Sequence, residues 1–186
     1  MKTKASLIIF AFAASCFSAH AEITAIKSTK KNDLAKLIKA AVFEGDATAP
    51  EIVPIQGDPD GGDGVSDGCV KVNSTSTGGL NGATAALGTV DAADQLISLS
   101  THVFNKNSSY VKYSVQFYNT TDKRVLASSP QASLNPKDNS TEKTVTLEYR
   151  TTAEDQGDTI EIRWIQHSTD STARDLYIDN FQVKTS

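Results

Sequence analysis

Alternation of apolar and polar side chains in the second half of the chain is the sequence feature that most restricts its fold. In residues 111–118, Val, Tyr, Val and Phe occupy every second position, with Lys, Ser, Gln and Tyr between them. Residues 144–150 and 160–165 show the same period of two. Because successive side chains of a strand point to opposite faces, this period predicts strands with one face in a core and the other in solvent.

Further strands complete an all-β pattern. Clusters of Asn, Asp, Gly and Pro, which favour turns, separate the apolar segments. Roughly eight short strands joined by such turns predict an antiparallel β-sandwich, specifically a jelly roll. The remaining strand candidates are residues 41–44, 70–73, 95–104, 125–128 and 175–183.

Other segments of the first half are predicted to be less regular. Residues 33–41 place Leu and Ile at helical spacing behind a candidate cap, Asn32, which predicts a short helix or a direct lead into the strand at 41–44. Residues 23–32 are predicted to be a loose leader. Residues 45–68, rich in Pro, Gly and Asp, predict a long ordered loop, and the small residues of 78–88 predict another loop.

The N-terminus has the three parts of a secretory signal peptide. A basic start, an apolar run to Phe17 and small residues at Ala19 and Ala21 predict cleavage before Glu22 and a secreted or periplasmic protein. The predicted organisation is a signal peptide at 1–21, a leader at 22–40 and a β-sandwich at 41–186. A buried N-terminal helix and lipid anchoring at Cys16 are the alternatives.

Composition excludes several classes of protein. The net charge of −4 becomes −6 when cleavage removes two lysines, which argues against a nucleic-acid partner. The sequence lacks an apolar run of the length that spans a membrane. Cleavage also removes one of the two cysteines, and the other, Cys69, is predicted to be a buried small side chain.

Two acidic segments carry the most specific chemistry. Residues 58–67 interleave four aspartates with glycines, so their oxygens could converge on a calcium ion, although a solvated acidic turn is an equal alternative. Asp179 lies between apolar neighbours of the last strand, where a carboxylate needs a cation or several donors to offset desolvation. Glu44 ends the first strand, and strands distant in sequence can be neighbours in a sandwich, so Glu44 and Asp179 are candidates to share one ion.

Three motifs are similar to those of CenC-like carbohydrate-binding modules. Residues 42–45 (VFEG) resemble the opening N-x-x-F-E-x-G motif, residues 66–72 (SDGCVKV) resemble the second strand, and residues 176–183 (LYIDNFQV) resemble the closing motif. The three matches fall in the same order as in the family and bracket about residues 41–184, which is most of the mature chain. The family implies a galactose-binding-like jelly roll with a structural calcium ion, held at Glu44 and Asp179 and by oxygens near Asp67. Two positions depart from the family: no Asn precedes Phe43, and Asn180 replaces an aspartate.

The polar face of the predicted sheet is the candidate ligand platform. Tyrosine rings stack on sugars, while Arg, Gln and Glu can bind vicinal hydroxyls, and the basic residues would also suit carboxylated or sulfated glycans. An ordinary solvated face with cross-strand charge pairs is the alternative. Trp164 shares the parity of its apolar neighbours and is predicted to lie in the core. The candidate ligand-binding residues are Tyr110, Gln116, Tyr118, Arg150, Arg163 and His167.

Together these patterns predict a secreted, noncatalytic domain that binds a polysaccharide or other glycan and uses calcium as a structural ion. Zinc-protease and phosphate-loop motifs are absent from the sequence. Two alternatives remain open. One is a polysaccharide lyase of the β-sandwich type, and the other is a cell-surface structural or interaction domain without affinity for sugars.

Overall fold

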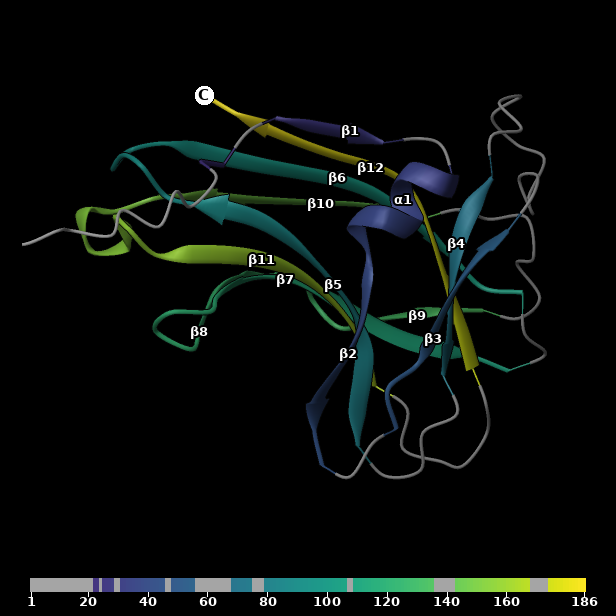
Figure 1. The fold of residues 1–186 in the computed structure, drawn as a ribbon. Coiled ribbons are helices and arrows are strands. Elements are labelled where there is room, and N and C mark those ends of the chain that lie inside the picture. Colours follow the sequence, from purple (N-terminus) through teal and green to yellow (C-terminus); the bar gives the residue numbers. More distant parts are fainter. Residues whose placement is uncertain are drawn as a thin grey trace, which may run out of the picture.

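Two antiparallel β-sheets packed face to face form the fold (Figure 1). The computed structural model describes residues 22–23, 25–28, 31–45, 48–55, 68–74, 79–106, 109–135, 143–167 and 174–186. Within these ranges, each sheet has six strands. The predicted all-β sandwich is therefore confirmed.

The first sheet, called the β12 sheet, has the strand order β10-β6-β12-β4-β3, with β1 paired to β12 beyond the end of β4. In Figure 1, its strands β1, β12, β6 and β10 run across the top, and β4 and β3 lie at the right. Its strands are β1 (Ile26–Ser28), β3 (Glu51–Ile55), β4 (Cys69–Ser74), β6 (Leu96–Phe104), β10 (Lys143–Arg150) and β12 (Arg174–Thr185).

The second sheet, called the β11 sheet, has the order β2-β5-β11-β7-β8, with β9 paired to β7. In Figure 1, β5, β11 and β7 bend together beneath the first sheet, and the outer face of the β11 sheet lies on the inner side of this bend. Its strands are β2 (Lys39–Glu44), β5 (Leu80–Thr89), β7 (Val111–Asn119), β8 (Arg124–Ser128), β9 (Ala132–Leu134) and β11 (Thr159–Gln166).

The core lies between the two sheets and is built from the apolar positions of the alternating strands. Trp164 of β11 is fully buried and meets Phe181 of β12 edge to face, with ring centroids 5.5 Å apart. Ile162 and Phe117 extend the contact along the β11 sheet. The prediction that Trp164 belongs to the core is confirmed, and Cys69 is buried as predicted.

The segment before β2 belongs to the sandwich, so the predicted loose leader is wrong. β1 pairs with β12, and the amide of Ile23 donates to the carbonyl of Thr89 at 3.2 Å. The predicted short helix is present as α1 (Lys31–Leu37), which buries Leu34. Asn32 lies inside the helix and is not its N-cap. Ile23, Leu34 and Ile38 of this segment belong to the buried core, and the burial of their apolar surface stabilises it.

Two segments predicted as loops contain strands. β5 occupies most of residues 78–88 and is an inner strand between β2 and β11, and β3 lies within residues 45–68. β5 is rich in Ala and Gly, which have low strand propensity. Pairing with β2 and β11 on its two sides outweighs this low propensity. Gly82 shows the reason for small residues, because an added Cβ would lie 1.9 Å from the Trp164 carbonyl oxygen.

The structure has no helix, among the residues it describes, that is long and apolar enough to cross a bilayer. Residues 1–21, with the predicted signal peptide and Cys16, lie outside the described ranges. Cleavage before Glu22 stays a prediction.

Replacing Gly82 by alanine should lower the free energy of unfolding by more than about 1 kcal/mol, because the new methyl group collides with the backbone of β11. Gly157→Ala is the matched control. Gly157 also has a positive φ, of 87°, but no atom lies within 4 Å of the added Cβ. Urea unfolding of both variants measures the difference, and equal losses would show that the close approach at Gly82 is unimportant.

Candidate functional site

The outer face of the β11 sheet carries a polar row that crosses its strands. The register pairs Lys39 of β2 with Thr84 of β5, Thr84 with Arg163 of β11, and Arg163 with Gln116 of β7. Gln116 pairs in turn with Ser128 of β8. Directly opposed residues share a face, so these side chains form one line perpendicular to the strands. We call this line, together with Phe43, Tyr118 and Glu161, the Arg163 face.

Arg163 is the best-fixed side chain of this face. Its guanidinium carbon lies 3.1 Å from the ring centroid of Tyr118 and 5.2 Å from that of Phe43. Its Nε donates to Oε1 of Glu161 at 2.7 Å. Tyr118 and Phe43 come from strands on opposite sides of β11, so the guanidinium is held from both sides. Such cation–π contacts contribute about 0.5–2 kcal/mol each.

Phe43 was not among the predicted ligand-binding residues, although it lies in the motif that suggested a metal ligand at Glu44. A register shift between Val42 and Glu44 interrupts the pairing of β2 with β5 at this residue. Its ring reaches over Gly82, where a Cβ would lie 3.3 Å from Cε2 of Phe43. A bulge that redirects an aromatic side chain over a glycine leaves no periodic signal in the sequence.

Two of the predicted ligand-binding residues lie at the far end of the same sheet. Tyr110 precedes β7 and is exposed, and His167 follows β11, where its amide donates to the carbonyl of Lys112 at 2.9 Å. His167 Nε2 lies 2.8 Å from Oγ of Ser114, and burial lowers the pKa of the imidazole. His167 is six residues from Glu161, the partner of Tyr118, which is roughly 20 Å along a strand. Tyr118 and His167 therefore cannot act on one atom.

Arg150 does not lie with these residues, and the predicted arrangement is wrong on this point. Arg150 ends β10, which pairs with β6 in the β12 sheet, and its Nη1 donates to the carbonyl of Asp94 at 2.9 Å. Thr146 and Glu148 lie on the same strand. An alternating pattern shows that a strand has two faces, but it does not show which of the two sheets the strand joins.

The outer face of the β12 sheet offers a second polar surface. Two adjoining hollows of about 160 and 210 Å³ share Ser100 of β6 and Gln182 of β12. The smaller hollow is also lined by Thr146 and Glu148, and the larger by Lys27 and His102. Apart from His102, the aromatic lining is limited to Phe181, whose side chain is buried, whereas the Arg163 face carries the rings of Phe43 and Tyr118.

The predicted metal ligands are spread over both sheets. Glu44 is exposed on the edge strand β2, opposite Leu80, while Asp179 is buried in β12 at a register shift against β6. The amide of Asn180, whose φ is 47°, donates to Oδ1 of Asp179 at 2.6 Å. Asp67 and the acidic loop lie outside the described residues. Within the described ranges, no three His, Cys, Asp or Glu residues gather as a metal site.

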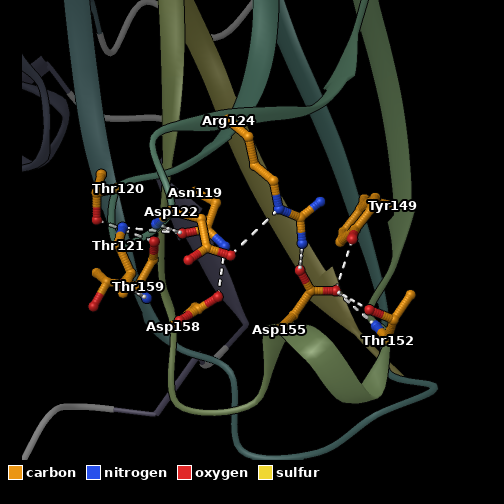
Figure 2. Close-up of polar contacts among 10 residues, drawn as sticks. All are labelled: Asn119, Thr120, Thr121, Asp122, Arg124, Tyr149, Thr152, Asp155, Asp158 and Thr159. Atoms are coloured by element: carbon orange, nitrogen blue, oxygen red, sulfur yellow. Dashed lines mark hydrogen bonds and ion pairs between the residues drawn. The ribbon is translucent and has the colours of Figure 1, made fainter.

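A buried carboxylate joins the two sheets at one end of the sandwich (Figure 2). Asp155, in the short helix η1 (Ala153–Asp155) between β10 and β11, is fully buried. Its Oδ1 binds Nη2 of Arg124 from β8. Its Oδ2 accepts hydrogen bonds from Tyr149 of β10 at 2.7 Å and from the amide and hydroxyl of Thr152 at 2.7 and 2.8 Å.

Burial by itself would raise the pKa of Asp155, but the hydrogen bonds from Thr152 and Tyr149 and the charge of Arg124 lower it below its usual value. The pKa of Tyr149 is raised by burial and by its bond to Asp155. Shifted pKa values often mark catalytic sites. Here, however, the carboxylate already accepts four hydrogen bonds from three residues, which is about its full capacity. The Asp155 cluster is therefore structural.

Comparison with known proteins bears on the fold. No family model and no curated protein matches the sequence. The xylan-binding CBM22-1 domain of Xyn10C from Paenibacillus barcinonensis is 14% identical, with a TM-score of 0.56 over 86% of this chain and 92% of that one. The family 11 carbohydrate-binding module of Lic26A-Cel5E from Clostridium thermocellum is 11% identical, with a TM-score of 0.52 over 86% and 95%.

A Stig cyclase from Fischerella sp. TAU is also similar, with 16% identity and a TM-score of 0.59 over 88% of this chain and 98% of that one. At these identities, the likeness shows a shared fold. The chain is a jelly-roll β-sandwich of the kind found in carbohydrate-binding modules. The resemblance to the CenC-like family in particular stays a prediction.

Asp155→Asn should lower the free energy of unfolding at pH 7 by about 2–3 kcal/mol, because it removes the buried charge that binds Arg124. Arg124 is partly exposed, and solvent screening keeps the loss below that of a fully buried pair. Because the folded-state pKa of Asp155 is lowered, its stabilisation is complete above the ordinary carboxyl pKa of about 4. It is lost as the pH falls from there through the lower folded-state pKa.

Urea unfolding between pH 7 and 3 should therefore show a shallower acid decline for Asp155→Asn than for the unmodified protein. Glu154→Gln, which changes the exposed neighbouring carboxylate, is the matched control and should keep the original slope. Parallel curves for Asp155→Asn and the unmodified protein would contradict the assignment.

Proposed function

We propose that this protein binds a carbohydrate chain noncatalytically on the Arg163 face. The observation that carries the proposal is the fixed group of Phe43, Arg163 and Tyr118 beside a polar row that crosses the sheet. Tyr118 and Phe43 hold Arg163 in position, and Gln116 and Thr84 present amide and hydroxyl groups to sugar hydroxyls. The shared fold with two carbohydrate-binding modules supports this choice.

The shape of the row favours an extended ligand. It runs from Lys39 on β2 to Ser128 on β8, and neighbouring strands lie about 4.8 Å apart, so it spans roughly 19 Å. A polysaccharide lying across the strands would meet one polar side chain at each strand in turn. A small ligand would use only a fraction of this row.

Secretion and a structural calcium ion are part of the proposal. The signal-peptide pattern of residues 1–21 supports export. Asp179 is a buried carboxylate at an irregular point of β12, and the acidic segment 58–67 is a source of further hard oxygen ligands. Glu44 would contribute the carboxylate implied by the CenC-like resemblance. When bound, calcium would stabilise the loops around the ligands.

Binding is tested by isothermal titration against a panel of glycans. Gln116→Ala should weaken binding about fivefold, the loss of about one hydrogen bond of 1 kcal/mol. Gln182→Ala removes the same side chain from the opposite face and should leave affinity unchanged.

Flat isotherms for the unmodified protein across the panel would contradict the proposal and favour a structural domain without sugar affinity. Growth of ultraviolet absorbance on uronic-acid polymers would indicate a lyase instead. A loss of affinity in Gln182→Ala but not in Gln116→Ala would show that the binding site lies on the β12 sheet.

Calcium should raise the melting temperature of the unmodified protein. A concentration 100 times the Kd stabilises the folded state by about 2.7 kcal/mol. Asp179→Ala should abolish this calcium-dependent gain, whereas Asp175→Ala, on the same strand and paired with Lys71, should keep it. Thermal unfolding with calcium and with chelator measures both variants, and coincident curves for the unmodified protein would refute the ion.

A further inference from the structure

We propose that the Arg163 face selects anionic polysaccharides, by binding a carboxylate or sulfate group at the two Nη atoms of Arg163. This inference rests on the proposed glycan-binding function and names the chemical class of the ligand. The new element is the charge of the polymer, because neither the fold nor the similar structures determine whether the bound glycan is charged or neutral.

The first argument is the way in which Arg163 is held. Its Nε is bound to Glu161, and the rings of Phe43 and Tyr118 hold the guanidinium from both sides. Among the described residues, Nη1 and Nη2 have no hydrogen-bond or ion-pair partner. These contacts restrict the rotamers of the Arg163 side chain. The side chain is nevertheless 20% exposed, so a ligand in solvent can reach it. A preorganised guanidinium loses little entropy when it binds a ligand.

The second argument is geometric. The two Nη groups of an arginine form a planar fork that matches the two oxygens of a carboxylate or sulfate, with two parallel hydrogen bonds. A lysine lacks this fork. Glu161 accepts a hydrogen bond from Nε, so the two Nη groups remain available to a ligand. The Arg163–Glu161 pair is therefore a means of orienting the arginine and leaves its Nη edge for an anion.

The third argument is the local charge. The Arg163 face carries two cations, Lys39 and Arg163, against one carboxylate, Glu161, since the other members of the row are Thr84, Gln116 and Ser128. Lys112 lies on the same face of β7 and is exposed. The chain as a whole carries a net charge of −4. A polyanion is therefore repelled by the protein at large and attracted at this row, which favours a specific site over general adhesion.

The test compares pairs of polymers that share a sugar backbone, one member of each pair being charged and the other neutral. Polygalacturonate is paired with its fully methyl-esterified form, and dextran sulfate with dextran. Titration of the purified protein should show at least tenfold tighter binding to one charged polymer than to its neutral partner. The first pair reports on carboxylates and the second on sulfates. The preference should weaken as salt is raised from 10 to about 150 mM, where the Debye length falls from about 30 to 8 Å.

Arg163→Lys keeps the charge but removes the fork, and should weaken binding to the preferred polymer about tenfold. Arg150→Lys makes the same change on the β12 sheet and should have no effect. Circular dichroism and melting curves establish that both variants are folded; should Arg163→Lys be unstable, Lys39→Gln, at an exposed position of the same row, replaces it with a smaller expected loss.

Each remaining outcome is informative. Equal affinity for charged and neutral polymers, or preference for a neutral one, would overturn this inference while leaving glycan binding intact. Absence of binding to every polymer would overturn both proposals. Equal losses for Arg163→Lys and Arg150→Lys would show that binding is diffuse charge attraction, which also overturns the assignment to Arg163.

Discussion

The orientation of β11 is the constraint on which both the core and the candidate site depend. Ile162 and Trp164 point into the sandwich, whereas Glu161 and Arg163 point outward. A slip of one residue would exchange these sets, burying a charged pair and exposing the only tryptophan of the chain. The strand is central, with β5 on one side and β7 on the other, so its register also sets the position of Gln116 and Thr84 relative to Arg163.

The segment before β11 is tied down by polar contacts. Asp155 joins Arg124 of one sheet to Tyr149 of the other, and the amide of Asp158 donates to the carbonyl of Asp155 at 2.9 Å. Asp158 in turn accepts a hydrogen bond from Asn119, at the end of β7. These bonds fix the point at which the chain enters β11, next to the irregular pairing of Ile160 and Glu161 with β5. The Asp155 cluster thus supports the site from a distance.

The Asp155 cluster and the Arg163 face differ in the hydrogen-bonding capacity that their charged groups leave unused. In the Asp155 cluster the carboxylate is saturated by four bonds. On the Arg163 face the guanidinium uses its Nε and has rings against it, while its Nη atoms have no partner among the described residues. Shifted pKa values draw attention to Asp155, but unused hydrogen-bonding capacity is what a ligand requires, and that lies at Arg163.

The sequence by itself determined the strands with a clear period of two, the burial of Trp164, and the outward position of Gln116, Tyr118 and Arg163, because alternation is a local property of each strand. It missed β5 and β1, since small or isolated residues form strands only when neighbours supply the packing. Only the tertiary structure decided that Arg150 belongs to the other sheet and that Phe43 and Lys39 join Arg163. Pairing between strands distant in sequence depends on the register and packing of the whole sandwich, and the period of a single strand contains no information about its partner.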